Sequence, residues 1–169
     1  MLIIAGVALL LLILLPSVYL QPEPLIWLLQ KLCGSAVLWH LPSSDSIALT
    51  IDDAPHGDGT STTAILDCLR RHGCHATFFV ISGQARGRES ILRRALLEGH
   101  ELANHMTEDT PSIMLTDFET HLMQCDHFLR QLSPGTPPRW FRPGSGFFSS
   151  RMLETVSRWV SLSGPRWCH

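Results

Sequence analysis

Ile47-Ala48-Leu49-Thr50-Ile51-Asp52-Asp53-Ala54-Pro55 is the stretch on which the interpretation of this chain rests. Residues 47–51 form an apolar run rich in β-formers, which predicts a strand buried on both faces. Two adjacent carboxylates, Asp52 and Asp53, follow this strand, and Pro55 ends it. Like charges so close together are costly unless one carboxylate is protonated or a cation lies between them. The alternative is an ordinary solvated turn that caps the next helix.

Length, charge and cysteine content set the limits of the interpretation. The 169 residues are enough for one domain with a hydrophobic core. The 13 basic and 15 acidic side chains give a formal charge of -2, which argues against a nucleic-acid partner. Nine histidines invite a search for metal ligands, whereas five cysteines without a Cys-x-x-Cys pair argue against a zinc ribbon. Pairing of Cys68 with Cys74 stays open.

The N-terminal region is predicted to direct the chain to the secretory pathway. Residues 1–15 are almost wholly apolar but fewer than the roughly 20 residues of a membrane-spanning helix, and they match the core of a secretory signal. We expect residues 1–24 to be a signal peptide or, preferentially, a signal anchor, which makes the protein membrane-anchored or extracellular, including the cell wall. The alternative is a buried N-terminal helix. Residues 25–46 are expected to add an amphipathic helix and a lead-in strand at 37–41.

From residue 47 to residue 160, strand-like runs alternate with amphipathic helices. The runs that predict strands are Ile47–Ile51, Ala76–Ile81, His100–Ala103 and Trp140–Arg142. Helices are predicted at about 60–73, 89–98, 116–132 and 150–160. This alternation implies parallel strands joined by crossover helices, hence an α/β domain of about four βα units. Thr60 or Ser61 is expected to cap the first helix, and Thr116 with Glu119 to form a capping box.

Four chemically versatile side chains lie just beyond predicted strands: Asp52, Asp53, His105 and Arg142. The carboxyl ends of parallel strands share one edge of the sheet, and functional residues collect there. We therefore expect these side chains to meet, although they are far apart along the chain. This convergence favours a cation site over a solvated turn.

The spacing of these residues predicts a three-ligand metal site. His105 and Asp109 are four residues apart, so they face the same way if the loop begins as a helical turn. Together with Asp53 they suit zinc or a similar divalent ion. Asp52 then stays unligated as the base toward water, and Arg142 holds it ionised. The alternatives are a hydrogen-bonded loop histidine and an ordinary ion-pair arginine.

Four segments together resemble the polysaccharide deacetylase family, or NodB homology domain: Thr50–Pro55, Ala76–Ile81, Gly99–His105 and Phe141–Pro143. Their order and spacing match over about residues 47–160, and the details look most like the chitin-deacetylase-like members. The resemblance implies a distorted (β/α) barrel, a divalent metal that is usually zinc, with cobalt or a similar ion as the alternative, and hydrolysis of N-acetyl groups. The implied substrate is an N-acetylated polysaccharide or oligosaccharide such as chitin.

The resemblance also implies roles for individual residues. Asp52 takes the position of the family's general base, and Arg142 that of the arginine that braces it. Asp53 and His105 take the positions of the first two metal ligands. The third ligand is usually a histidine four residues after the position of His105, where this chain has Asp109, a carboxylate that can also bind zinc.

Two features depart from the family pattern. Gly144 and Ser145 stand where the family has a proline and an aromatic residue, so the Ser145 backbone N–H takes the place of the oxyanion donor. The family's general acid, a histidine in a late Leu-x-x-His motif, has no match. We therefore expect an incomplete, C-terminally truncated domain over 47–160 with an aberrant or disordered tail over 161–169, which folds poorly or is inactive as a monomer.

Two other functions stay open. A metal-dependent phosphohydrolase would also use Asp52 and Asp53, although a nucleophilic aspartate favours an Asp-x-Asp pattern directly after the strand. A non-catalytic carbohydrate-binding module would keep the shape of the site without the acid. Acetate release from chitin oligomers would distinguish a deacetylase from a phosphohydrolase and from a binding module.

Overall fold

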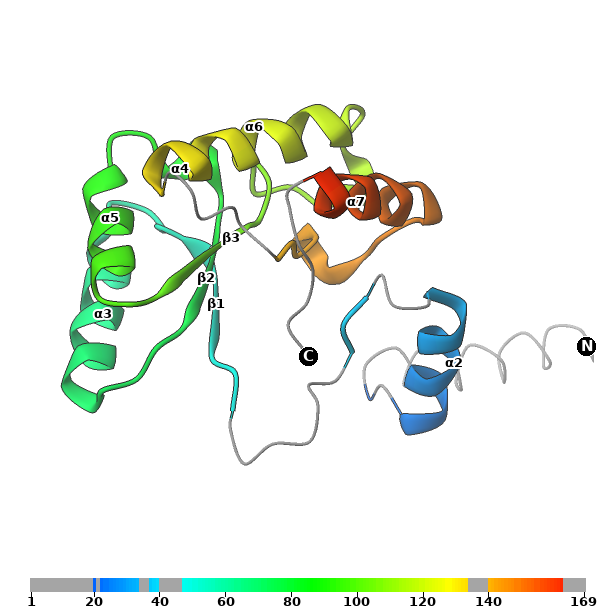
Figure 1. Ribbon diagram of the computed structural model, residues 1–169, viewed down its shortest axis with the longest axis horizontal. Coiled ribbons are helices and arrows are strands. Elements are labelled where there is room, and N and C mark those ends of the chain that lie inside the picture. The colour runs from blue at the N-terminus through cyan, green and yellow to red at the C-terminus, as the bar shows by residue number, and fades with distance from the viewer. Residues whose placement is uncertain (1–19, 21, 34–36, 40–46, 134–139, 163–169) are drawn as a thin grey trace, which may run out of the picture. The chain divides into compact units, whose positions relative to one another are not determined.

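The structure is a computed structural model that describes residues 20, 22–33, 37–39, 47–133 and 140–162 (Figure 1). The chain divides into two compact units, 1–44 and 45–169. In the described parts of the chain, no helix combines the length and the apolar character that a membrane crossing requires.

The first unit contains the helix α2, Glu23–Cys33. Pro24 lies in the first turn, where its missing N–H costs nothing, and the Lys31 ammonium lies 5.4 Å from the centre of the Trp27 ring. Residues 37–39 are not in a strand, so the described part of the predicted lead-in strand is absent. The apolar residues 1–15 lie outside the described residues.

The second unit is built on three parallel strands in the order β1-β2-β3, which confirms the α/β class. The strands are β1, Thr50–Ala54, β2, Thr77–Val80, and β3, Glu101–Asn104. The helices are α3, Thr60–His72, α4, Ser82–Ala85, α5, Glu89–Leu97, α6, Phe118–Leu132, and α7, Ser150–Leu162. Two short 3₁₀ turns complete it, η2, Ser112–Met114, and η3, Gly144–Gly146.

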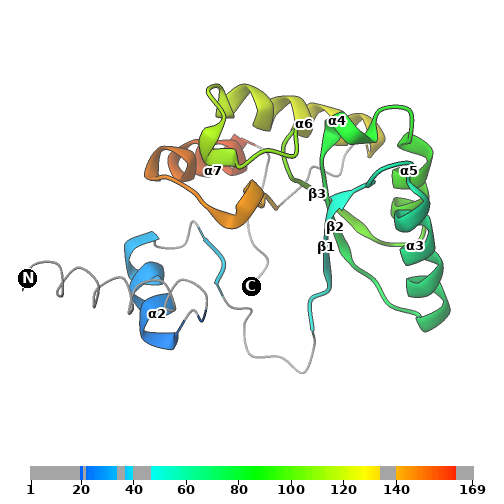
Figure 2. The same cartoon turned by 180° about the vertical axis from the view of Figure 1, so that it is seen from behind.

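The connecting helices lie side by side outside the sheet. Both α3 and α5, each of which links two neighbouring strands, pack next to each other in the two opposite views (Figures 1 and 2). The longer α6 follows β3 and packs against it. This is the arrangement that right-handed βαβ crossovers produce, and it places every strand-to-helix loop at the carboxyl edge of the sheet.

The first strand differs from its prediction in place and in burial. It begins at Thr50 and includes both aspartates, whereas Ile47 is 95% exposed and Leu49 is 44% exposed. The expectation of a strand buried on both faces was therefore wrong. Among the described residues β1 has β2 as its only strand neighbour, so the start of β1 is exposed on its other side. The central strand β2 lies between two strands, and its Phe78 and Val80 are fully buried.

The predicted fourth strand is reduced to a single bridge. Phe141 pairs in parallel with Asn104, whose N–H donates to the Trp140 carbonyl and whose carbonyl accepts from the Arg142 N–H. Pro143 follows at once and has no N–H to continue the ladder. Over residues 47–133 and 140–162 the structure thus has three strands and one bridge rather than four full βα units.

Both predicted helix caps were wrong, although the helices were right. Gly59, with φ 87°, precedes α3, and the Asp58 carboxylate rather than a hydroxyl accepts from the Thr60 N–H at 2.9 Å. Asp117 precedes α6 and makes no side-chain cap hydrogen bond, so the capping box does not form. The α3 helix ends at Gly73, whose φ of 61° is the left-handed cap that glycine favours.

The core lies between the sheet and the connecting helices. Its fully buried members include Phe78 and Val80 of β2, Leu66 of α3, Leu92 of α5 and Cys125 of α6. Burial raises the pKa of the Cys125 thiol to about 12, which keeps it protonated. Cys68 and Cys74 are exposed free thiols in this structure, so they do not pair.

Candidate active site

A bulge in β1 brings two adjacent carboxylates to one rim. Successive side chains of a regular strand point to opposite faces. Ile51 pairs with Phe78 and Ala54 with Val80, so β1 holds one residue more than β2 in this interval. Asp53 absorbs the extra residue with φ 60°, a left-handed conformation that aspartate tolerates. As a result Asp52 and Asp53 both reach groups from the loops that follow β3 and Phe141.

Arg142 holds the Asp52 carboxylate. Its Nη1 donates to Asp52 Oδ1 at 2.6 Å and to the Thr50 hydroxyl at 3.1 Å. The guanidinium carbon lies 4.1 Å from the centre of the Phe79 ring, within range of a cation–π interaction. Three contacts from two strands therefore orient one arginine. The predicted pairing of Arg142 with Asp52 is present.

His105 presents one ring nitrogen to Asp53. Its Nδ1 lies 2.7 Å from the Arg142 carbonyl oxygen, and since a carbonyl only accepts, Nδ1 carries the hydrogen and donates. In the neutral ring Nε2 then carries the free lone pair, and this atom lies 3.4 Å from Asp53 Oδ1. Two acceptors that face each other at this distance call for a proton or a cation between them. A histidine whose other nitrogen donates to a carbonyl is the usual form of a metal ligand.

The structure does not bring Asp109 to this pair. Among the residues it describes, no three His, Cys, Asp or Glu side chains come close enough together to hold a metal ion. The helical turn on which the prediction depended does not form, because Met106 adopts φ 71°. Asp109 is exposed, while Thr107 Oγ1 instead forms a hydrogen bond with Nδ1 of His121 on α6. The described residues supply two of the three predicted ligands.

Ser145 lies in the tight turn η3 directly after Arg142 and Pro143. Its φ of 61° and the 3.1 Å hydrogen bond from the Gly146 N–H to the Pro143 carbonyl define this turn. The Ser112 hydroxyl accepts from the Gly144 N–H at 2.7 Å. Ser145 is exposed.

The sequence analysis missed two residues of this neighbourhood, Phe79 and Ser112. Phe79 belongs to a predicted strand, and the alternation of its neighbours only indicates that it faces opposite to Phe78. Ser112 lies in a polar loop, where the sequence carries no signal of its burial. Both are found only from the tertiary contacts.

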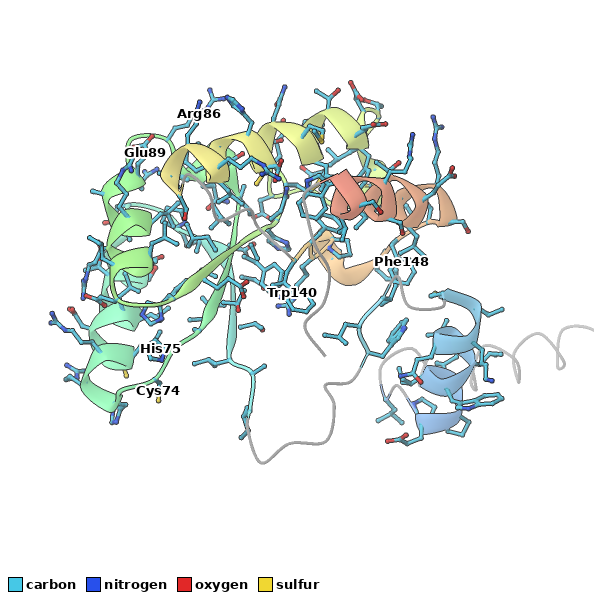
Figure 3. The ribbon with its side chains drawn as sticks, in the orientation of Figure 1. Cys74, His75, Arg86, Glu89, Trp140 and Phe148 are labelled. Atoms are coloured by element: carbon cyan, nitrogen blue, oxygen red, sulfur yellow. The ribbon has the colours of Figure 1, made fainter. Side chains whose placement is uncertain are left out.

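The candidate site is separate from two surface cavities of the described residues. One, of about 780 Å³, lies between α5 and α6, where Arg86 and Glu89 are seen in Figure 3. The other, of about 260 Å³, lies between η2 and the start of α7. Neither is lined by the aspartates of β1, by His105 or by Arg142.

Comparison with known proteins supports the same assignment. A model of the polysaccharide deacetylase family matches residues 41–159. The chain is similar to a chitooligosaccharide deacetylase of Sinorhizobium fredii, at 35% identity over 124 residues that cover 72% of this chain and 56% of that protein. The chain thus spans little more than half the length of this relative.

Two solved structures show the same fold over part of their length. One is a peptidoglycan N-acetylglucosamine deacetylase, with 29% identity and a TM-score of 0.61 over 67% of this chain and 52% of that chain. The other is a family 4 acetyl xylan esterase from Clostridium thermocellum in complex with a cobalt ion, with 28% identity and a TM-score of 0.58 over 64% and 53%. With the family motifs on the carboxyl edge of the sheet, this chain belongs to the polysaccharide deacetylase family.

Proposed function

We propose that this protein is a metal-dependent hydrolase that removes N-acetyl groups from an amino-sugar polymer, with chitin-type oligosaccharides as the substrate class. The single observation that carries the proposal is the meeting of two pairs at one rim, Asp53 with His105 and Asp52 with Arg142. Because the chain spans about half of its relatives, this activity is proposed for the chain and is not transferred from them.

Asp53 and His105 are the residues that would hold the divalent ion, with zinc or cobalt as the candidates. Their facing acceptor atoms, 3.4 Å apart, fit two ligands of one cation. Bound there, the ion supplies Lewis-acid polarisation and lowers the pKa of water.

The remaining chemistry belongs to the chain's own residues. Asp52 is held by Arg142, whereas His105 faces Asp53. Asp52 is therefore the carboxylate that accepts the proton of the attacking water. The water oxygen bonds to the acetyl carbon, Asp52 returns the proton to the departing nitrogen as the C–N bond breaks, and acetate and a free amine result. The Ser145 backbone N–H donates to the carbonyl oxygen as that oxygen gains negative charge.

We further propose that the protein acts in the secretory pathway, held at a membrane or released outside the cell. The apolar residues 1–15 support this proposal by their composition. Fractionation of cells that express the full chain tests it: signal in the membrane or secreted fraction is expected, and recovery in the cytosol alone contradicts it.

The activity is tested by acetate release from N-acetylated chitin oligomers. We expect release by the full chain, its loss with a chelator, and its recovery when Zn²⁺ or Co²⁺ is returned. Oligomer binding without acetate release would indicate a carbohydrate-binding module instead. Phosphate release from an aryl phosphate would indicate a phosphohydrolase.

A further inference from the structure

The loop that follows His105 is clamped between two glycines. On one side the Gly83 N–H donates to the Thr107 carbonyl at 3.0 Å, and a side chain on Gly83 would collide with that oxygen. On the other side a Cβ on Gly144 would lie 2.6 Å from the Thr110 carbonyl oxygen. Since both obstacles are backbone atoms, neither can give way cheaply. The loop therefore packs backbone to backbone against η3.

Ser112 is the side chain that joins this loop to η3. It is 1% exposed, and its hydroxyl accepts from the Gly144 N–H at 2.7 Å. Without that acceptor, the half-buried Gly144 N–H regains a partner only when the turn shifts or a water replaces the hydroxyl. The Ser112 hydroxyl is therefore positioned to fix the location of residues 143–146.

The turn is fixed independently at its other end. The Arg142 N–H donates to the Asn104 carbonyl at 3.1 Å, and the Arg142 carbonyl accepts from His105 Nδ1 at 2.7 Å. With this end held on β3 and the turn closed by its own Gly146–Pro143 hydrogen bond, the Ser112–Gly144 hydrogen bond anchors the turn to the neighbouring loop. The next peptide carries the Ser145 N–H, so its direction follows from the same bond.

We propose that Ser112 is a positioning residue, which fixes η3 through Gly144 and thereby aims the Ser145 N–H at the reacting carbonyl. The catalytic half of this inference rests on the proposed deacetylase function. The structural half does not, because it concerns only the hold of Ser112 on the turn. A donor that is displaced by about 1 Å loses much of its effect on the transition state while substrate binding is little changed.

The test compares Ser112→Ala and Gly144→Ala with wild type, in the full chain. In Ser112→Ala we expect faster hydrogen exchange of the Gly144 amide by NMR and a kcat lowered about 10- to 100-fold, with KM nearly unchanged. Gly144→Ala keeps the hydroxyl but pushes the turn off Thr110, so it is expected to lower kcat in the same way. Ser149→Ala is the matched control, because it too removes a serine hydroxyl that accepts a backbone N–H, that of Met152 at 3.3 Å; its kcat should equal that of wild type.

Two outcomes would overturn the proposal. The first is unchanged exchange of the Gly144 amide in Ser112→Ala, and the second is a wild-type kcat in a folded Ser112→Ala protein. If wild type itself releases no acetate, the proposed function fails on its own account. In that case, the hydrogen exchange of the Gly144 amide and the NMR chemical shift of the Ser145 amide, compared between wild type and Ser112→Ala, still show whether Ser112 holds the turn.

Discussion

The Asp52 carboxylate and the Arg142 guanidinium form a hydrogen bond of 2.6 Å, although 90 residues separate them along the chain. Asp52 lies on β1, and Arg142 follows the bridge beyond β3, three strand positions away. In a flat sheet three spacings amount to about 14 Å. One side-chain pair closes that span, and Phe79 of the central strand lies beneath the guanidinium. The site is therefore assembled by side chains that reach across the sheet from β1 to the bridge beyond β3.

The first prediction concerns the base. Asp52→Asn keeps the shape of the side chain and removes its ability to accept a proton, so acetate release should fall about 10²- to 10⁴-fold. Metal affinity should stay near that of wild type, since Asp52 does not face His105. The measurement is kcat on an N-acetylated chitin oligomer together with metal titration. A variant that retains most of its kcat would remove Asp52 from the role of base.

Asp67→Asn is the matched control for this substitution. Asp67 Oδ1 also lies 2.6 Å from an arginine nitrogen, Nη2 of Arg94. This pair joins the helices α3 and α5 and includes no residue of the candidate site. Arg94 lowers the pKa of this carboxyl through their hydrogen bond. An exposed pair of this kind contributes little to stability, so the free energy of unfolding should change little and kcat should not change.

The second prediction separates the metal ligands. Loss of a residue that hydrogen-bonds to a metal ligand typically lowers metal affinity roughly 10- to 100-fold. Asp53→Ala and His105→Ala each remove a ligand itself, so each should weaken Zn²⁺ or Co²⁺ binding by more than that. Asp109→Ala should weaken it less than either, because Asp109 is not gathered with them in this structure. Calorimetric titration of the metal-free protein measures all three. Equal affinity in wild type and Asp53→Ala would refute the assignment.

Residues near helix ends show what the sequence can predict. Gly73 and Gly99 were expected to close α3 and α5, and both have positive φ where each helix ends. A glycine after an amphipathic run is a local signal with a local cause. The start of α3 was mispredicted because Asp58, two residues earlier than the expected cap, accepts the first N–H.

The site shows where such prediction stops. The convergence of the strand ends followed from topology, and the pairing of Arg142 with Asp52 is present. The bulge at Asp53 and the positive φ of Met106 leave no trace in the hydrophobic pattern, because each is a backbone choice that tertiary packing enforces. The bulge directs the Asp53 carboxylate toward His105, and the positive φ of Met106 directs Asp109 away from that pair.

The third prediction assigns a role to Phe79. Its ring faces the Arg142 guanidinium at 4.1 Å and meets the His105 ring edge-on at 6.2 Å. Phe79→Leu keeps an apolar side chain but loses a cation–π interaction worth about 0.5–2 kcal/mol, so Arg142 should hold Asp52 less firmly and kcat should fall. Phe78→Leu is the control: Phe78 is fully buried on the other face of β2, so that variant should lose stability while each folded molecule keeps its kcat. Equal kcat values for the two variants would contradict the role.

The fourth prediction concerns stability below neutral pH. Burial lowers the pKa of His100, and the neighbouring His75 lowers it further, whereas Glu98, whose Oε2 lies 4.0 Å from His100 Nε2, opposes the shift. His100 Nδ1 accepts from the Ala76 N–H at 3.2 Å, and a proton on Nδ1 would break that hydrogen bond. The unfolded chain therefore binds this proton more readily than the folded one.

The sign of the pH effect follows from that difference. The stability that neutral His100 contributes is fully present above the unfolded pKa of about 6.5, and it is lost as pH falls through the lowered folded pKa, at no more than about 1.4 kcal/mol per pH unit. His100→Asn retains an acceptor and does not titrate, so its free energy of unfolding should differ less between pH 7.5 and pH 5.5 than that of wild type. His72→Asn removes an exposed histidine from the end of α3 and leaves the contacts of His100 in place, so it should keep the wild-type difference. Denaturant titrations at the two pH values measure these differences, and an undiminished loss in His100→Asn would place the pH sensitivity in another group.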